Sequence, residues 1–486
     1  MPLRTAEQYK ASLQDDRVVY FRGQRMRDVT QHPLVQLAIA HEATDYRLMA
    51  DPCFRDLAVV RHPEKGEEMS RYFLLPRSAE DLLKRSELIE TACREGGALV
   101  VLSKVVGSDG LFGLLRTTKK IDAALGTSYH PRAKAFYDYC WTNDLNFALA
   151  QTDVKGDRAL RPSEQADPDL YLRIVQERSD GIIVRGAKVH TSNTTHANEM
   201  IVLPTRAMGE ADKAYAVAFA IPVATKGLKL VMSGYGSYTQ RNPFDHPVSA
   251  AVKMTETLTI FDDVFVPNER IFLKGEWQFA GALALSFVEY HRLTAISYKL
   301  PFLDLLVGAA RLVAEYNGIE RAAHVREKLF WLASYAETTR ALTRQACMQA
   351  VPTELGMVIP HPALVNIAKH HFAAHFHQAL SHVQDLAGGI LVTGPAMEDV
   401  QSPETGPLID KYLQGQKGTS GKERLQVLNL LQDITASDFG GYQAVLALHA
   451  EGSMEAEKLQ LYREYDWQRV IAYARRMAGL GKRGTC

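Results

Sequence analysis

Residues 170–188 read LYLRIVQERSDGIIVRGAK, and this stretch decides how the middle of the chain is built. Two runs rich in β-branched and apolar residues flank Asp180-Gly181, and an Asp-Gly pair in that setting is a strong signal for a tight β-hairpin. Similar short runs continue along the chain: Met200–Pro204, Ala214–Ile221, Leu228–Met232, Glu256–Phe261 and Val264–Pro267. Many short strands at regular spacing predict a β-barrel or sandwich, placed here in residues 146–275.

The segments on either side of this β-rich zone have helical patterns. Residues 1–145 contain Ser78–Thr91, which opens with an N-cap residue, and Arg132–Asn143, which follows a proline. A short alternating stretch at 18–22 predicts a small hairpin. Residues 276–486 carry apolar residues at three- and four-residue spacing in five segments: Phe302–Tyr316, Ala322–Met348, Pro362–Ala387, Glu423–Ser437 and Ser453–Ala478. We therefore expect an α+β protein with an N-terminal helical domain, a central β-barrel and a C-terminal helical bundle.

The composition narrows the classes of partner. Lys+Arg and Asp+Glu number 56 each, so the formal net charge is zero, and neither a nucleic-acid nor an anionic-membrane partner is expected. The sequence has no run of about eighteen apolar residues, so no membrane span is predicted. The N-terminus lacks the apolar core of a signal peptide. The five cysteines are scattered, which favours free thiols in a reducing, cytoplasmic compartment: Cys53, Cys93, Cys140, Cys347 and Cys486.

Three motifs resemble nucleotide or metal sites but lack a required part. Gly479–Gly484 has GxGxxG spacing, yet it follows a helical pattern rather than a strand. Gly418–Lys422 lacks the first glycine of a phosphate-binding loop, because Gln416 stands there. His371 and His375 can share a helix face, but no acidic residue lies between them as in metal-binding helices. No metal site is predicted.

Two hydroxyl-rich or charged stretches are better placed to contact a ligand. Thr152–Arg158 combines a hydroxyl, charges and a glycine in a turn-like segment, and Val189–His196 is rich in hydroxyls. Such segments hydrogen-bond a cofactor or its phosphates, or they simply form polar turns. On local sequence alone, the polar turn is the default interpretation of the first stretch.

Several segments resemble one flavoprotein family in the same order along the chain. They are Thr5–Tyr20, Asp28–Pro33, Lys155–Arg158, Asp180–Lys188, Phe261–Pro267 and Asp438–Gly441. The likeness runs from about residue 4 to about residue 460, and the chain resembles the 4-hydroxyphenylacetate 3-hydroxylase family, which includes 4-hydroxybutyryl-CoA dehydratase. The resemblance implies an acyl-CoA dehydrogenase-like fold, FAD bound between the barrel and the helices, and a homotetramer.

The resemblance also implies which residues contact the flavin. The first group is the loop formed by Thr152, Lys155, Gly156, Asp157 and Arg158. Ser192 stands where the family usually has a flavin-contacting threonine. The last group is a C-terminal turn formed by Glu451, Gly452, Ser453 and Met454.

The iron–sulfur signature of the dehydratase branch is incomplete in this chain. Those enzymes hold a cluster with three cysteines and a histidine, and the histidine matches His291. The cysteine positions match Val101, Val105 and Tyr298, none of which supplies a thiolate. The resemblance therefore predicts that the chain carries no cluster.

The remaining family residues supply the candidate chemistry. The dehydratase acid/base tyrosine and glutamate are replaced by Ala295 and Leu446, whereas Glu256 and Lys299 match. His291 is the strongest acid/base candidate, since a histidine titrates near working pH. Lys299 is placed to hold a substrate anion or the flavin edge. The predicted catalytic residues are therefore His291, Lys299 and Glu256.

The phenol-binding residues of the hydroxylase branch are also replaced. Its arginine, tyrosine and histidine match Gly107, Leu111 and Leu149, so the pocket beside the flavin is expected to be apolar. The first hypothesis is a two-component monooxygenase that takes reduced FAD from a separate reductase, since no credible NAD(P)H fingerprint is found. The second is a cluster-free dehydratase, isomerase or dehydrogenase acting on CoA thioesters, and the third is a degenerate, non-catalytic flavin-fold protein.

Overall fold

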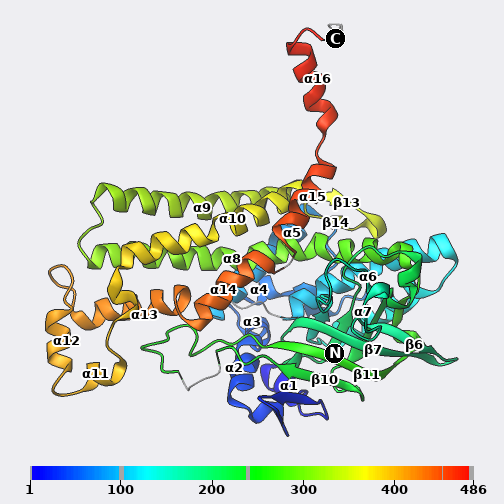
Figure 1. Cartoon of the computed structure of the whole chain (residues 1–486), viewed down its shortest axis with the longest axis horizontal. Coiled ribbons are helices and arrows are strands. Elements are labelled where there is room, and N and C mark those ends of the chain that lie inside the picture. Colours follow the sequence, from blue (N-terminus) through cyan, green and yellow to red (C-terminus); the bar gives the residue numbers. More distant parts are fainter. Residues whose placement is uncertain (1–2, 98–102, 237–240, 451, 481–486) are drawn as a thin grey trace.

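The computed structural model describes residues 3–97, 103–236, 241–450 and 452–480. Long helices form one layer of the molecule, the strands gather below one end of it, and the C-terminal helix projects away from the body (Figure 1). The N-terminal helices are α1 Ala6–Ala11, α2 Pro33–Glu42, α3 Thr44–Ala50, α4 Arg55–Ala58, α5 Ala79–Glu95, α6 Ser103–Leu125 and α7 Tyr129–Thr142. The N-cap predicted for α5 is present, because Ser78 Oγ accepts a hydrogen bond from Asp81 N at 3.1 Å.

The first sheet contains the hairpin that the Asp180-Gly181 pair predicted. Its six strands lie in the order β2 Gln24–Arg25, β1 Val19–Phe21, β10 Leu228–Met232, β11 Glu256–Pro267, β7 Gly181–Ser192 and β6 Arg173–Glu177. The sequence predicted two strands at 256–267, but β11 is continuous across a register shift between Phe261 and Val264. Asp263 takes a positive φ of 53° within this bulge, so the strand bends and continues.

The N-terminal hairpin joins the central sheet. Strand β1 runs parallel to β10, with Val19 opposite Leu230. Residues near the start of the chain therefore complete a sheet whose other strands come from residues 173–267. Local patterns predict the hairpin, but its parallel partner lies about two hundred residues away, beyond what local sequence patterns specify.

The second sheet is the buried one. Its four strands lie in the order β12 Ile271–Lys274, β9 Val217–Pro222, β8 Glu199–Val202 and β5 Phe147–Ala150. All four residues of β8 are buried, and isolated bridges such as Asp153–Lys188 link the neighbourhood of this sheet to the first one. In the described part of the chain the strands form two open sheets rather than the closed barrel that strand spacing suggested. Two further small hairpins are β3 Val59–Arg61 with β4 Glu68–Ser70, and β13 Val351–Pro352 with β14 Val358–Ile359.

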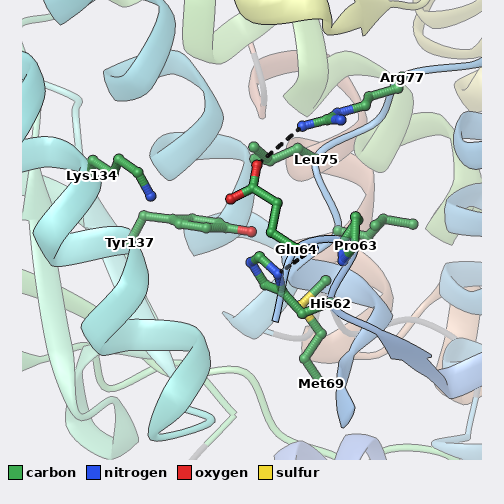
Figure 2. A pocket seen from close by; sticks show the side chains of 9 residues that line it. His62, Pro63, Glu64, Met69, Leu75, Arg77, Lys134 and Tyr137 are labelled. Carbon is green, nitrogen blue, oxygen red and sulfur yellow. Dashed lines mark hydrogen bonds and ion pairs between the residues drawn. The ribbon is translucent and has the colours of Figure 1, made fainter. Parts of the chain in front are cut away.

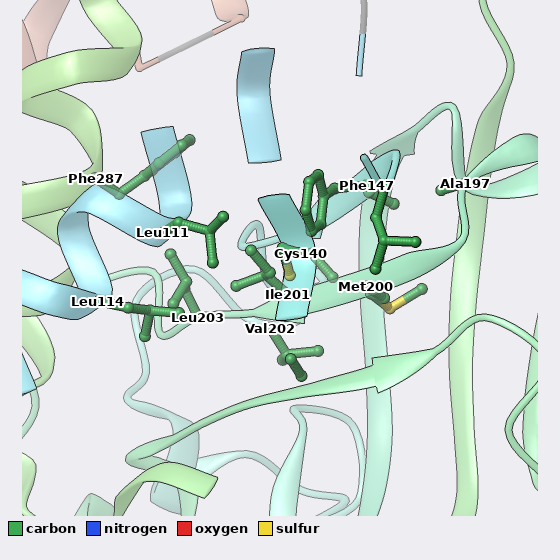
Figure 3. Packing of buried hydrophobic residues seen from close by; sticks show 14 of the residues in the cluster. Leu111, Leu114, Cys140, Phe147, Ala197, Met200, Ile201, Val202, Leu203 and Phe287 are labelled. Atoms are coloured by element: carbon green, nitrogen blue, oxygen red, sulfur yellow. The ribbon is translucent and has the colours of Figure 1, made fainter. Parts of the chain in front are cut away.

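Glycines on α6 allow unusually close packing between the helical and β layers. A Cβ atom on Gly107 would lie 2.3 Å from the ring of Phe147, and one on Gly113 would lie 2.8 Å from the backbone nitrogen of Phe287. Leu111 lies between them on α6 and is 1% exposed. Figure 3 shows this dry core, where α6 side chains meet strands β5 and β8 and the start of α8.

The C-terminal half is the predicted set of long helices with some different boundaries. They are α8 Ala280–Tyr316, α9 Ala323–Met348, α10 Pro362–Ala387, α11 Met397–Gln401, α12 Gly406–Tyr412, α13 Gly421–Thr435, α14 Asp438–His449, α15 Met454–Glu464 and α16 Trp467–Met477. The single helix predicted at 453–478 is two helices that meet at Tyr465 and Asp466. One helical stretch, Trp277–Tyr316, is long and apolar enough to cross a membrane, but 78% of its most apolar window is buried, as in a core helix.

Candidate active site

Residues 155–158 of the predicted flavin loop are exposed, and hydrogen bonds from Gln165 fix the loop backbone. Gly156 has a φ of 51°, and a Cβ atom there would lie 2.5 Å from Gln165 Oε1, so the position favours glycine. The amide of Gln165 accepts from Asp157 N at 3.0 Å and donates to Asp157 O at 2.9 Å. With its backbone fixed in this way, the loop leaves the side chains of Lys155 and Arg158 exposed.

Ser192 and Glu256 lie opposite each other at the ends of β7 and β11. Ser192 Oγ donates to Glu256 Oε1 at 2.9 Å. Tyr442 Oη on α14 donates to the same oxygen at 2.6 Å, whereas Glu256 Oε2 is buried without a hydrogen-bond partner among the described residues. Burial raises the pKa of Glu256 to about 7, although both hydroxyls and the charge of Lys253 oppose the shift. A carboxyl group with such a pKa can take up or release a proton near neutral pH.

A cation and a second tyrosine support this carboxyl group. Lys253 Nζ donates to the backbone carbonyl oxygen of Tyr235 at 2.6 Å. The same Nζ lies 3.4 Å from the centroid of the Tyr235 ring. Burial, then the charge of Arg241, lowers the pKa of Lys253 to about 7. The ring of Tyr235 stacks on that of Tyr442 with centroids 4.3 Å apart, which fixes the phenol that reaches Glu256.

His291 lies on α8 in a buried ionic network. Its Nδ1 is 3.1 Å from Asp109 Oδ2, and Arg85 Nη2 donates to Asp109 Oδ1 at 2.6 Å. The imidazole also stacks on Phe287, with centroids 4.7 Å apart and an interplanar angle of 20°. The three polar residues come from α5, α6 and α8, so the arrangement depends on the packing of three separate helices.

Lys299 lies two turns further along α8, where this helix meets α14. Its Nζ is 5.2 Å from the ring centroid of Tyr298 and 5.1 Å from that of Phe372. A small pocket at this contact is also lined by Gln443 and Leu446. The lysine is therefore held against aromatic faces beside the helix that carries the tyrosine bonded to Glu256.

The C-terminal turn lies against α10 and approaches α8. Gly452 O accepts from Lys369 Nζ at 3.0 Å, and Lys369 pairs at 2.6 Å with Glu457, both side chains being buried. Ser453 is the N-cap of α15, which begins at Met454. A Cβ atom on Gly452 would lie 3.9 Å from the guanidinium of Arg292, the neighbour of His291. Glu451 lies outside the described residues.

Direct contacts bring several of these elements together. Val189 N donates to Thr152 O at 3.0 Å, so the flavin loop lies beside β7. The hydrogen bond from Tyr442 to Glu256 joins α14 to the end of β11, and residues of both α8 and α14 line the small pocket beside Lys299. Burial lowers the pKa of His190, which lies near the end of β7.

Other stretches have different roles from those that their sequence suggested. The hydroxyls in Val189–His196 do not form an exposed phosphate cradle: Thr191 and Thr194 are at most 1% exposed and bond within the β domain. A surface pocket between the β3–β4 hairpin and α7 is lined by His62, Arg77 and Tyr137 among others (Figure 2). None of the predicted site residues lines it.

The positions that distinguish the dehydratase branch from the hydroxylase branch are filled by tightly packed side chains. Leu111 and Val105 are buried, and the ring of Phe147 fills the space that a side chain on Gly107 would need. Val101 lies outside the described residues. Cys93, Cys140 and Cys347 are buried and form no disulfide among the described residues, and burial raises the pKa of each thiol, so they do not supply thiolates at neutral pH.

The residues present fit a flavin dinucleotide. The exposed cations Lys155 and Arg158 complement a pyrophosphate, and the loop backbone between them is already fixed. The unpartnered Oε2 of Glu256 is a buried acceptor that lacks a donor within the described chain. A bound ring system with an N–H or O–H group would satisfy it. Bound FAD would supply the redox chemistry here.

Asp109, Tyr442 and Lys253 were not predicted from the sequence. Asp109 had a usable signal, because it is an acidic residue within an otherwise apolar helical stretch and had to be buried with a partner. Tyr442 had none, since a tyrosine on a C-terminal helix has no local mark of its contact with a strand 186 residues away.

Comparisons with known proteins agree with this arrangement. The N-terminal domain of 4-hydroxyphenylacetate 3-hydroxylase matches residues 5–273, and its C-terminal domain matches residues 280–479. The 4-hydroxybutyryl-CoA dehydratase/vinylacetyl-CoA-Δ-isomerase of Clostridium aminobutyricum is 33% identical over 98% of this chain and 100% of that protein. The oxygenase component of 4-hydroxyphenylacetate 3-monooxygenase from Thermus thermophilus is 28% identical over 87% of this chain and 86% of its own length.

Two groups of solved structures have the same fold. An oxygen-tolerant archaeal 4-hydroxybutyryl-CoA dehydratase from N. maritimus superposes with a TM-score of 0.92 at 30% identity, covering 99% of this chain and 96% of that one. The FAD complex of an oxygenase component of 4-hydroxyphenylacetate 3-monooxygenase superposes with a TM-score of 0.89 at 26% identity, covering 98% of both chains. The chain therefore belongs to the 4-hydroxyphenylacetate 3-hydroxylase family.

Proposed function

We propose that this chain is the FAD-dependent oxygenase component of a two-component monooxygenase, which acts on a small aromatic or otherwise activated organic substrate. One observation carries the proposal: Ser192, at a predicted flavin contact, donates to Glu256, a carboxyl group whose pKa is raised to about 7 and whose second oxygen is buried without a partner among the described residues. Relatives of the same family include several oxygenase components and a structure with FAD bound.

The chain's own residues would bind and handle protons around the cofactor. Lys155 and Arg158 would hold its phosphates, and Glu256 Oε2 would accept a hydrogen bond from the ring system or from the substrate. His291 and Glu256 would exchange protons with the reacting groups. Lys299 would hold a negatively charged part of the substrate or the flavin edge.

We expect a substrate with an apolar body, because the side chains that would bind a phenolate are absent. Gly107 and Leu111 replace the arginine and tyrosine expected of phenol-binding relatives, and no larger side chain fits at Gly107. A 4-hydroxyphenylacetate-like phenolate is therefore not the expected substrate.

A separate flavin reductase would supply reduced FAD, because the chain lacks a credible NAD(P)H fingerprint. Among the described residues Cys53, Cys140 and Cys347 form no disulfide, which supports placing both proteins in the cytoplasm, where thiols stay reduced.

We also propose that the active form is a homotetramer assembled partly through the C-terminal helices. Figure 1 shows α16 projecting away from the body. Its apolar residues Trp467, Ile471 and Met477 recur on one side of the helix and are 42%, 39% and 70% exposed. Truncation after Glu464 should yield a smaller assembly, measured by light scattering. The circular dichroism spectrum of the truncated protein should show that its subunits remain folded. Unchanged mass would contradict this assignment.

The decisive experiment mixes the anaerobically reduced, FAD-loaded protein with oxygenated buffer in a stopped-flow absorbance instrument. A transient phase that precedes flavin reoxidation is expected from an oxygenase, and substrate candidates should alter its decay. Slow, single-phase reoxidation would overturn the monooxygenase assignment.

The second candidate is a cluster-free enzyme for CoA thioesters. Full-length identity of 33% to a CoA-thioester dehydratase favours it specifically. The family resemblance also matches Glu256, His291 and Lys299 to positions of the dehydratase branch. Butyryl-CoA or crotonyl-CoA should then raise the melting temperature, because a ligand that binds only the native state stabilises it. No shift at millimolar thioester, together with the transient oxygen phase, would rule this candidate out.

A further inference from the structure

We infer that Asp109 and Arg85 are positioning residues that fix the ring and the tautomer of His291, so that Nε2 is the reactive nitrogen. The inference rests on the proposed function in giving His291 an acid/base role. It adds two residues outside the predicted site and assigns the proton on the ring.

Arg85 holds the carboxylate of Asp109 rigidly. Its guanidinium donates to Asp109 Oδ1 at 2.6 Å, to Tyr72 O at 2.8 Å and to Val105 O at 3.0 Å. Arg85 and Asp109 are buried, with side chains 4% and 0% exposed. A buried ion pair with this many additional hydrogen bonds has one well-defined geometry. Asp109 is therefore a fixed acceptor on one side of His291.

A carboxylate that is paired with an arginine can only accept hydrogen bonds. Because Asp109 Oδ2 lies 3.1 Å from His291 Nδ1, the proton of the neutral ring must sit on Nδ1. Nε2 then carries the free lone pair. Among the described residues Nε2 has no hydrogen-bond partner, and it is not a sealed atom, since the side chain retains 11% exposure.

The ring plane is fixed by packing as well. Phe287, one turn earlier on α8, stacks on the imidazole at 4.7 Å, and the backbone of Phe287 lies against Gly113 of α6. The same helix, α6, supplies Asp109. Stacking and hydrogen bonding from two helices thus hold Nε2 in one direction, as an acid/base group requires.

The test uses the apo protein and diethyl pyrocarbonate, which acylates an unprotonated imidazole nitrogen. The rate at His291 is measured by peptide mass spectrometry and divided by the rate at His377, an exposed histidine on α10. In Asp109→Asn the amide oxygen stays with Arg85 and the NH2 group faces Nδ1, so the ring proton moves to Nε2. The relative rate at His291 should fall at least about tenfold.

The matched control is Asp144→Asn. Asp144 pairs with Lys104 at 2.8 Å, and both side chains are buried, but neither contacts His291. This variant should lose stability comparably while the relative rate at His291 stays within about twofold of wild type, because the His291 tautomer is unchanged. An unchanged rate in Asp109→Asn, or an equal fall in Asp144→Asn, would overturn the inference.

A measurement on wild-type protein covers the case in which Asp109→Asn does not fold. The 15N spectrum of histidine-labelled wild type minus that of His291→Gln isolates the two ring nitrogens of His291. A protonated Nδ1 with an unprotonated Nε2 is expected, and the reverse would refute the assignment. Because neither measurement needs FAD or oxygen, a failed oxygenase assay leaves both results interpretable.

Discussion

Asp109 and Glu256 both carry buried carboxyl oxygens, but their surroundings differ. Asp109 uses one oxygen for Arg85 and the other for His291, so a full cation compensates its charge. Glu256 receives two neutral hydroxyl donors on one oxygen, and its other oxygen has no partner among the described residues. Its pKa is raised to about 7, chiefly by burial.

This difference in charge compensation assigns a positioning role to Asp109 and a proton-transfer role to Glu256. A carboxylate paired with arginine keeps its charge and holds a neighbour in place, whereas an incompletely compensated one can exchange a proton near pH 7. Four predictions test this division, in order of decreasing effect.

Asp109→Ala should have the largest effect, on stability. It leaves the Arg85 guanidinium buried without a counter-charge, which costs about 3–5 kcal/mol for a buried pair. Urea unfolding at pH 7 measures the loss. Asp262→Asn, on the exposed part of β11 and paired with Lys229, serves as the control and should change little. A cost below about 1 kcal/mol would show that the Arg85–Asp109 pair is solvated.

Glu256→Gln should have the next largest effect, on turnover. The amide cannot take up a proton, and removal of a general acid/base group typically lowers the rate by about 100-fold or more. Single-turnover kinetics with a substrate found in the oxygen screen measures it, with FAD affinity determined alongside. Turnover that stays within about twofold of wild type would remove Glu256 from the acid/base role.

The difference in stability between Glu256→Gln and wild type should depend on pH. The wild-type carboxyl has a pKa of about 7 in the folded state, against an ordinary value of 4.5, so its proton stabilises the folded state at low pH. That contribution is fully present below about pH 4.5 and is lost as the pH rises through 7. Glutamine stays neutral, so the variant should gain about 1–3 kcal/mol over wild type above pH 7 and little at pH 5.

Melting curves from pH 5 to pH 8.5 measure this difference. Glu42 and Asp45 also have raised pKa values, about 7 and 8, so wild type and variant share a common pH slope that cancels. Parallel curves for the two proteins would mean that Glu256 is charged in the folded state at all these pH values.

Tyr442→Phe should have the smallest effect of the four. It removes one of the two donors to Glu256, worth about 1 kcal/mol or roughly fivefold in rate, and raises the pKa of Glu256 further. The pH midpoint of turnover should therefore move upward. Tyr235→Phe is the control, because its hydroxyl donates to Met254 O and not to Glu256. Equal shifts of the pH midpoint in both variants would show that the stacked rings of Tyr235 and Tyr442, rather than the Tyr442 hydroxyl, control the pKa of Glu256.

Much of the local structure could be predicted. The helix Pro362–Ala387 has the predicted bounds, Ser78 caps α5, and the Asp180-Gly181 turn joins β6 to β7. Each depends on contacts within a few residues, so apolar spacing, caps and turn residues carry the information. The catalytic roles of His291, Lys299 and Glu256, and the domain boundaries at 145 and 275, stay predictions.

The contacts that join distant segments could not be predicted in the same way. By itself the sequence determined the types of the elements, the family and the candidates His291 and Glu256. Only the tertiary structure decided that Asp109 reaches His291, that Tyr442 reaches Glu256 and that β1 pairs with β10. These contacts join residues far apart along the chain, and they form only when helices and sheets have packed and excluded water from the groups between them.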